Sequence, residues 1–213
     1  MLKFPAFTLL NFCLNHGLLQ IFNRPKWKTV LNGCKTYIEK ALNEIDKKFL
    51  NEPVLEVTPE NNKVKLITDK RTEFFDYCVM SSHPPETLEI LKFADFETKD
   101  LLSKFKFQKN EAVLHFDESV LPEKKIAWAS WNYLSTESTC GNDSVSVSYL
   151  INKLQPLPLE KSVIVTLNPV SNIDNKKIFK RISYQHPIFS IETILAQREI
   201  CLLYTSPSPR DRG

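Results

Sequence analysis

The second half of the chain is dominated by short stretches that favour β-strands, and one of them constrains the fold most. Residues 144–149 read Ser-Val-Ser-Val-Ser-Tyr, a strict alternation of small polar with apolar side chains. Because successive side chains of a strand point to opposite faces, this alternation predicts a sheet with one wet face, as antiparallel sheets have. Further strands are predicted at residues 112–116, 126–134, 163–167 and 178–184.

The first half mixes helical and strand patterns. Apolar residues at three- and four-residue spacing predict helices over residues 2–22 and 37–45. Alternation on both sides of Asn61 and Asn62 predicts a hairpin, and the nearly continuous apolar run at 74–80 predicts a more buried strand. Three more helices are predicted, near residues 86–92, 98–105 and 191–200. The expected fold class is α+β, with a mostly antiparallel sheet.

Composition narrows the class of protein. The 213 residues are 42% hydrophobic and 25% charged, enough to bury a substantial core. A net charge of only +3, spread along the chain, argues against a nucleic-acid partner. Five well-separated cysteines without a Cys-x-x-Cys pair argue against a disulfide scaffold and a metal site. No apolar stretch approaches the roughly 18 residues of a membrane span, so a cytoplasmic protein is expected.

Glycine is scarce, and this excludes one kind of site. A loop that cradles a pyrophosphate needs several glycines at the start of a helix, so that backbone N–H groups can approach the phosphates. The chain has four glycines, and none form a G-x-G-x-x-G or P-loop pattern. By itself the chain is expected to bind a dinucleotide weakly or not at all.

Five blocks of residues occur in the order and spacing of one protein family. They are residues 16–19 with 23–27, residues 32–39, residues 112–115, residues 127–133, and residues 165–168 with 184–187. Through these blocks the chain resembles the bacterial-type FAD-dependent amine oxidase-like proteins of the flavin-containing amine oxidoreductase superfamily. The resemblance implies a flavoprotein oxidoreductase with FAD as cofactor, which removes a hydride from a small-molecule or lipid-like substrate by an amine oxidase or desaturase-like reaction.

The resemblance also implies a domain organisation. Residues 1–31 would be a helical part of the substrate domain, 32–82 a partial, Rossmann-like FAD-binding segment, and 83–200 the substrate-domain sheet and helices. The chain would then be a fragment truncated at both ends and inactive alone. Residues 201–211 match one reading frame of a sequencing-library adapter, so 201–213 are interpreted as an artefact; the alternative is a natural Pro- and Ser-rich terminus.

Four residues are implied to contact the cofactor. Gly33 takes the place of a glycine pair close to the flavin, although Asn32 departs from that pair. Val54 matches a valine whose backbone pairs with adenine, and Ser81 and Ser82 fall where a strand approaches the dinucleotide. The alternatives are a plain helix-entry turn for Gly33, a core strand position for Val54, and a helix cap for the serines.

His115 is the candidate catalytic residue. It stands at the position of a lysine that, in related monoamine oxidases, lies beside the reactive flavin nitrogen and holds a water. Histidine can donate, accept and change protonation near neutral pH. Because histidine replaces lysine, the mechanism need not be the same, and the alternative is a core histidine satisfied by hydrogen bonds.

Trp131 and Tyr133 are the candidate substrate-binding residues. An aromatic wall excludes water and suits an apolar or cationic substrate. Positions 131 and 133 share one face of a strand, whereas 128 and 131 differ by an odd number, so Trp128 is expected in the core.

The sequence leaves a second function open. The sheet and its aromatic residues could serve a non-catalytic α+β domain that binds a lipid or a partner protein. A G-x-G-x-x-G element encoded upstream in the same reading frame would favour the oxidoreductase.

Overall fold

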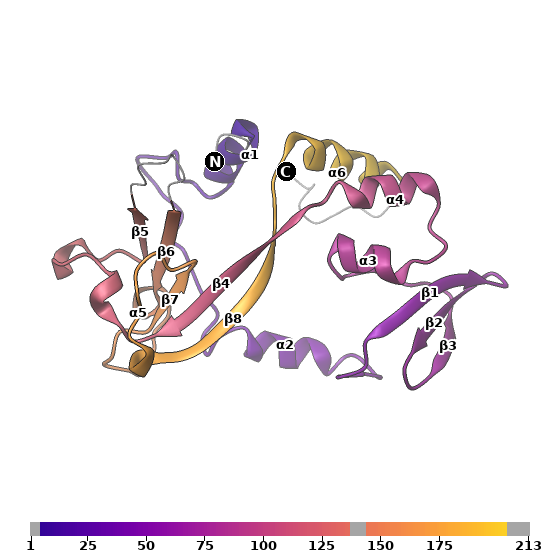
Figure 1. Ribbon diagram of the computed structural model, residues 1–213, viewed down its shortest axis with the longest axis horizontal. Coiled ribbons are helices and arrows are strands. Elements are labelled where there is room, and N and C mark those ends of the chain that lie inside the picture. The colour runs from indigo at the N-terminus through magenta and orange to yellow at the C-terminus, as the bar shows by residue number, and fades with distance from the viewer. Residues whose placement is uncertain (1–4, 137–143, 204–213) are drawn as a thin grey trace. The chain divides into compact units, whose positions relative to one another are not determined.

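The computed structural model describes residues 5–136 and 144–203, and these form an α+β fold with two separate sheets (Figure 1). Of residues 201–213, which the sequence suggests are an artefact, 204–213 lie outside the described range. Contacts divide the chain into two units. The first unit comprises Met1–Pro25, Ile45–Phe107 and Pro187–Gly213, and the second comprises Lys26–Glu44 and Gln108–His186. The division into domains that the sequence suggests stays a prediction.

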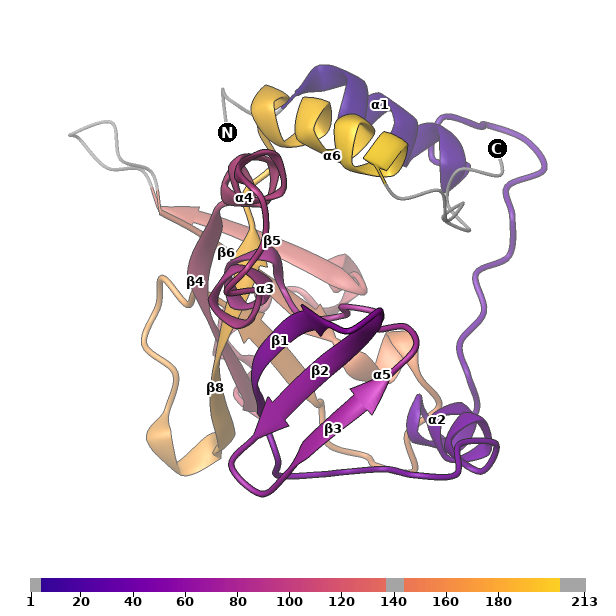
Figure 2. The same cartoon turned by 90° about the vertical axis from the view of Figure 1, so that its right-hand side faces the viewer.

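The first unit combines a three-stranded sheet with helices. Its antiparallel strands follow the order β1 (Val54–Glu60), β2 (Lys63–Thr68), β3 (Thr72–Phe75), a meander that faces the reader in Figure 2. Helix α3 contacts β1, and α4 contacts both α3 and α6. The helices of this unit are α1 (Ala6–Asn15), α3 (Pro84–Ile90), α4 (Phe96–Ser103) and α6 (Ile191–Leu203).

The predicted hairpin is confirmed, with the expected turn. Asn61 and Asn62 have φ angles of 52° and 62°, the left-handed pair that a two-residue hairpin turn requires and that asparagine tolerates. At the other end of the meander, Arg71 donates to Glu52 and its guanidinium stacks 3.4 Å from the centroid of Phe49. These contacts close the base of the small sheet.

Helix α1 is shorter than its sequence pattern predicts, and Gly17 explains why. The helix ends at Asn15, and Gly17 follows with a φ angle of 63°, which terminates helices and favours glycine. A Cβ atom at this position would lie 2.5 Å from Cδ of Pro25. Both the backbone angle and the neighbouring proline therefore require glycine here.

The strand predicted at residues 74–80 is only partly confirmed. Strand β3 ends at Phe75, and Tyr77 and Val79 are 90% and 87% exposed. Apolar residues favour a buried strand only where a neighbouring strand supplies hydrogen bonds and another layer covers the side chains. Within the described part of the chain, no strand pairs with residues 76–80.

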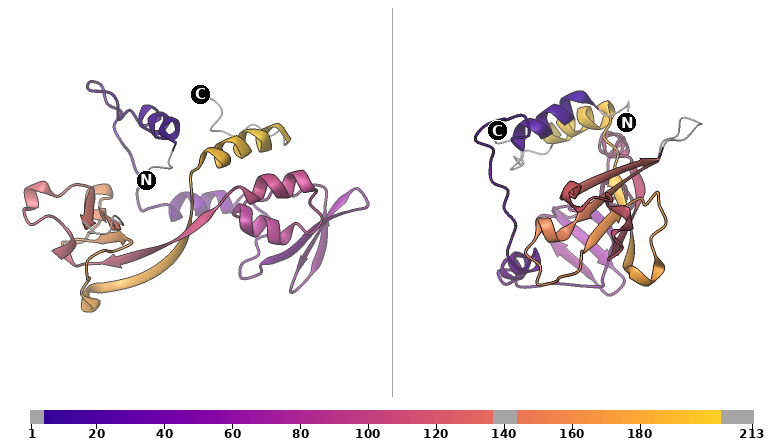
Figure 3. Two further views of the ribbon diagram at one scale, coloured as in Figure 1. Left: turned by 45° about the horizontal axis from the view of Figure 1, so that its top comes forward. Right: turned by 90° about the vertical axis from the view of Figure 1, so that its left-hand side faces the viewer.

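The second unit is built on a five-stranded antiparallel sheet of order β5-β6-β7-β4-β8. The long strands β4 and β8 run side by side, as Figure 3 shows. The strands are β4 (Phe107–His115), β5 (Trp131–Thr136), β6 (Ser144–Leu150), β7 (Ile164–Leu167) and β8 (Ile178–Pro187). Helices α2 (Lys35–Leu42) and α5 (Ile151–Leu154) and three short 3-10 helices, Glu118–Val120, Lys125–Ala127 and Asn175–Lys177, complete the unit.

The core of the second unit lies against one face of this sheet. Buried side chains from the strands pack against the segment that follows β4, and together they comprise Val113, Val120, Leu121, Leu150, Ile164 and Ile173. Trp128 packs against this cluster and donates its indole N–H to the carbonyl of Pro122 at 2.7 Å. It lies before β5, because residues 125–127 form a 3-10 helix instead of the start of the predicted strand. Trp128 therefore packs against the core, but the strand alternation from which this was predicted does not reach it.

Asp117 joins this covering segment to the residues that precede β8. Its buried carboxylate accepts hydrogen bonds from the N–H groups of Ser119 and Asp174 and from the ammonium of Lys177, at 3.2, 2.9 and 3.0 Å. Desolvation opposes ionisation, but the hydrogen bonds from Asp174, Lys177 and Ser119 outweigh it and hold the pKa of Asp117 well below its usual range.

Replacing Asp117 with asparagine should lower the free energy of unfolding by about 2–4 kcal/mol at neutral pH, because hydrogen bonds to a charged acceptor are lost inside the fold. A carboxyl with a depressed folded-state pKa stabilises the protein above its unfolded pKa of about 3.9 and loses this effect as the pH falls toward the folded value. Acid denaturation followed by circular dichroism should therefore show a shallower loss of stability below about pH 4 in Asp117→Asn than in the wild type. The exposed Glu123→Gln serves as control, and equal slopes in both variants would contradict this role of Asp117.

Candidate functional site

The cross-strand register of the large sheet gathers apolar side chains on the face opposite the core. Residues directly opposite one another in antiparallel strands share a face. The pairing yields two rows, Trp131–Tyr149–Val165–Leu114 and Tyr133–Val147–Leu167–Ala112. We call these eight residues the apolar sheet face.

Aromatic rings concentrate at one corner of the apolar sheet face. Trp131 is 49% exposed and Tyr133 is 57% exposed. The ring of Trp131 meets Tyr149 edge-on at 6.1 Å between centroids, and Trp27 meets Trp131 edge-on at 6.2 Å. Edge-to-face packing of this kind is favourable and fixes the orientation of the rings. The structure thus brings the two predicted substrate-binding residues together, with Trp27 from another part of the sequence beside them.

The polar residues of the alternating strand lie on the buried face. Ser146 and Ser148 are 3% and 2% exposed, whereas Val145 and Val147 between them are only half-buried. A sequence judged by polarity alone would turn the serines toward solvent. The structure reverses this: Ser148 belongs to a buried hydrogen-bonded network, and Val147 belongs to the apolar sheet face.

His115 lies inside that network and is fully buried. Its Nδ1 accepts from the backbone N–H of Asp117 at 3.1 Å, and its Nε2 lies 2.8 Å from Oγ1 of Thr166. Thr166 in turn lies 2.8 Å from Oγ of Ser148. Since a backbone N–H can only donate, Nδ1 carries no proton, and the neutral ring donates from Nε2 to Thr166. Both ring nitrogens are engaged within the protein.

Burial lowers the pKa of His115 below its ordinary value. The positive charge of Arg181 acts in the same direction, while the carboxylate of Asp117 partly opposes it. His115 is the last residue of β4, and the side chains of this strand alternate between the two faces of the sheet. His115 lies on the face opposite Trp131 and Tyr133. The catalytic role predicted for His115 remains a prediction, and the structure separates this residue from the aromatic corner by the sheet itself.

Gly33 and Val54 occupy backbone positions with special geometry. Gly33 follows Asn32 in a turn before α2, with φ angles of 80° and 63°, and a Cβ atom at Gly33 would meet nothing within 4 Å. The backbone angle, and not a close neighbour, favours glycine here. Val54 begins β1, where a register shift between Val54 and Glu56 places Leu55 outside the regular pairing.

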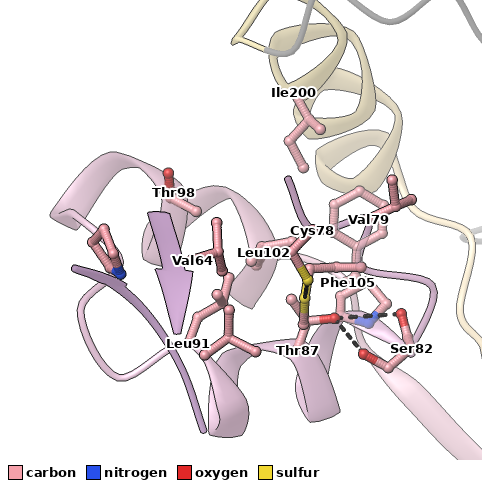
Figure 4. Close-up of a pocket in the computed structure, with 14 residues that line it drawn as sticks. Val64, Cys78, Val79, Ser82, Thr87, Leu91, Thr98, Leu102, Phe105 and Ile200 are labelled. Atoms are coloured by element: carbon pink, nitrogen blue, oxygen red, sulfur yellow. Dashed lines mark hydrogen bonds between the residues drawn. The ribbon is translucent and has the colours of Figure 1, made fainter. Parts of the chain in front are cut away.

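Ser82 lines a cavity in the first unit, whereas Ser81 is exposed and does not (Figure 4). The cavity has a volume of about 670 Å³ and is bounded by apolar side chains of β1, β2, α4 and α6, among them Val57, Val64 and Leu102. Oγ of Ser82 lies 2.8 Å from Oγ1 of Thr87 at one end of it. Ser82 precedes the helix-capping residue, because His83 is the N-cap of α3.

Sequence reasoning did not single out one polar group beside the apolar sheet face. Nδ2 of Asn110 lies 2.9 Å from Nδ1 of His186, and Nδ2 of Asn168 donates to Oδ1 of Asn110 at 3.1 Å. Two of these residues fall within the blocks at 165–168 and 184–187 that carry the family resemblance. The contact between residues 110 and 186 spans 76 positions, so only the folded chain reveals it.

Within residues 5–136 and 144–203, no helix combines the length and apolar character needed to cross a membrane. The same residues contain no cluster of three or more histidine, cysteine, aspartate or glutamate side chains suited to a metal ion.

The fold of the chain is similar to that of one solved structure. The sequence matches no known protein-family profile and no curated protein. Among solved structures, the chain is similar to a putative protoporphyrinogen oxidase from Exiguobacterium sp. 255-15, with 14% identity and a TM-score of 0.53. The similarity covers 93% of this chain and 51% of that protein, so the chain spans about half of its length. At this identity the likeness shows the fold alone.

A weaker similarity links the chain to a CLA-producing fatty acid isomerase from P. acnes. The identity is 13%, the TM-score is 0.45, and the match covers 74% of this chain and 40% of that protein. A TM-score at this level supports no conclusion.

Replacing His115 with glutamine should remove a pH dependence of stability. In the wild type the folded-state pKa of His115 lies below the unfolded value of about 6.5, so the unfolded chain takes up the proton first and the free energy of unfolding falls as the pH drops below about 6.5. Denaturant titrations between neutral and mildly acidic pH should show this loss in the wild type and in the exposed control His16→Gln. A loss of the same size in His115→Gln would contradict the assignment of the neutral ring.

Proposed function

We propose that the chain forms the substrate-side part of an FAD-dependent oxidoreductase, with the apolar sheet face turned toward the substrate. The single observation that carries this proposal is the apolar sheet face, exposed at Trp131 and Tyr133, which the fold builds opposite a buried polar face. The fold similarity to an oxidase over 93% of the chain and the sequence resemblance to flavin-containing amine oxidoreductases support it.

Contact of an apolar face with water raises the free energy of the folded protein, and a domain that acts alone would avoid it. Large contiguous apolar patches on soluble proteins mark binding sites, because water contacts with them are unfavourable. Here the sheet could have buried the valines, tyrosines and leucines of this face against the core and exposed its serines instead. Its inverse arrangement fits a surface that another molecule covers during function.

FAD is the cofactor that the family resemblance implies, and the chain offers part of what it needs. The register shift after Val54 takes backbone N–H and C=O groups at the start of β1 out of the regular pairing. Such groups can hydrogen-bond to a flat polar ring such as adenine. The turn at Gly33 would contribute a backbone contact, and Ser82, with Ser81 next to it, would contribute hydroxyl groups. The chain lacks a glycine-rich phosphate loop, so the pyrophosphate must be held by residues outside it.

The bound flavin would supply the acceptor for a hydride, and this chain would supply the surroundings of the substrate. Trp131 and Tyr133 would orient the substrate and exclude water from it. His115 would take part directly only after its hydrogen bonds to Thr166 and Asp117 rearrange. We propose a small-molecule or lipid-like substrate that loses hydride from a C–N or C–C bond.

A second candidate is a non-catalytic domain that binds a lipid or a partner protein. The apolar cavity of about 670 Å³ in the first unit favours it, since its volume lies within the range of small-molecule pockets. Flavin binding by the full-length protein separates the two functions.

Expression of the full-length gene should yield a protein with flavin absorbance that bleaches when substrate is added. In that protein Trp131→Ala should reduce kcat/KM by about tenfold to a hundredfold, because a large apolar contact with the substrate is removed. The control Ile126→Ala removes a 95% exposed apolar side chain of the same unit and should leave kcat/KM unchanged. A colourless, well-folded full-length protein would count against the oxidoreductase, and an unaffected Trp131→Ala enzyme against the site.

The 213-residue chain alone should show no flavin reduction when mixed with FAD and substrate. It has no glycine-rich loop to anchor the pyrophosphate, so the cofactor should not be held in place. Stopped-flow absorbance at saturating FAD tests this, and reduction at the rate of the full-length protein would show that the chain carries a complete site.

A further inference from the structure

A chain of hydrogen bonds beside the apolar sheet face begins at the backbone. The N–H group of Glu111 donates to Oδ1 of Asn168 at 3.0 Å. Nδ2 of Asn168 then lies 3.1 Å from Oδ1 of Asn110, and Nδ2 of Asn110 lies 2.9 Å from Nδ1 of His186. These hydrogen bonds thus connect four groups in one continuous series. The groups come from β4, from β8 and from the residue that follows β7.

The backbone fixes the direction of every bond in this chain. Because the N–H of Glu111 can only donate, the Asn168 atom that it meets is the carbonyl oxygen. Asn168 therefore presents its NH₂ group to the carbonyl oxygen of Asn110, and Asn110 presents its NH₂ group to His186. Nδ1 of His186 must accept, so a neutral His186 carries its proton on Nε2 and presents a donor.

This donor belongs to the end of the apolar sheet face. Asn110, Ala112 and Leu114 are alternate residues of β4, so their side chains lie on the same side of the sheet. Ala112 belongs to the row with Leu167, Val147 and Tyr133. The face is consequently apolar along its length and polar at the end where Asn110 and His186 meet.

None of the eight residues of the apolar sheet face is charged. The nearby Glu111 is paired with Arg181 at 3.0 Å, so its carboxylate is already engaged. A bound ammonium group would find at this end a donor from His186 and no carboxylate among the face residues. An acceptor oxygen, in contrast, would complete the hydrogen-bond chain.

We propose that the site takes an elongated amphipathic substrate whose polar head is an acceptor oxygen, either a carboxylate or a carbonyl, bound by Nε2–H of His186. The apolar body of the substrate lies along the two rows toward Trp131. Asn110 and Asn168 are positioning residues that hold the imidazole in its donating form. This inference deepens the proposed function, and a binding measurement tests it independently of turnover.

The test uses full-length protein near neutral pH and two probes of equal length, octanoate and octylammonium. Isothermal titration should give octanoate a Kd about tenfold lower than that of octylammonium, because only octanoate accepts the hydrogen bond. His186→Ala should abolish this preference, His186→Gln should keep part of it through its amide donor, and Asn168→Asp should weaken it because a carboxylate cannot donate to Asn110. The neighbouring Gln185→Ala is the matched control and should keep the full preference.

Octanamide separates the two sources of the acceptor oxygen. A carbonyl site binds octanamide as tightly as octanoate, whereas a carboxylate site prefers octanoate, and both results support the inference. Equal or tighter binding of octylammonium, a preference that survives in His186→Ala, or no binding of any probe would overturn it. A colourless protein that still prefers octanoate would refute the proposed function and leave this inference standing.

Discussion

The backbone register that joins β6, β7 and β4 is the constraint on which the second unit depends. A shift of one residue in any of these pairings would exchange the two faces of a strand. The hydrogen bond from His115 to Thr166 and the hydrogen bond between Thr166 and Ser148 oppose such a shift, because the first links β4 to β7 diagonally and the second links β7 to β6 at directly paired positions. A slipped strand would leave these polar groups buried without partners, at about 1–3 kcal/mol for each group.

This polar interior leaves apolar side chains of the strands on the opposite face, where Trp131 and Tyr133 are exposed. Burying hydroxyl and imidazole groups is unfavourable unless they are hydrogen-bonded. Among the described residues, no buried side-chain nitrogen or oxygen lacks a partner. The core of the unit is then completed by aliphatic residues around Val113 and Ile164. The remaining apolar side chains of the strands form the apolar sheet face, which is buried at Ala112 and exposed at Trp131 and Tyr133. This face ends at Asn110 and His186.

Sequence patterns predicted much of the fold, but not which face of the alternating strand at residues 144–149 is buried. The α+β class and the hairpin around Asn61 and Asn62 follow from spacing and turn chemistry, and the structure confirms them. Trp128 packs against the core, but it lies before β5, so the strand alternation is not the reason. The alternation at 144–149 reveals two faces but not which one the chain covers, since that depends on where the segment after β4 packs. The run at 74–80 reads as a buried strand because its pattern cannot show that pairing stops at Phe75. The candidate cofactor residues and the role of His115 stay predictions, whereas the Asn110–His186 contact depends on chain segments far apart in sequence.

A structure of the full-length protein with flavin and substrate bound would test most directly whether the two faces of the sheet have different roles. We expect the substrate against Trp131 and Tyr133, with His115 still bonded to Thr166 and the N–H of Asp117 on the other side. Substrate bound in contact with His115, with Trp131 buried against another part of the protein, would contradict this division of the sheet.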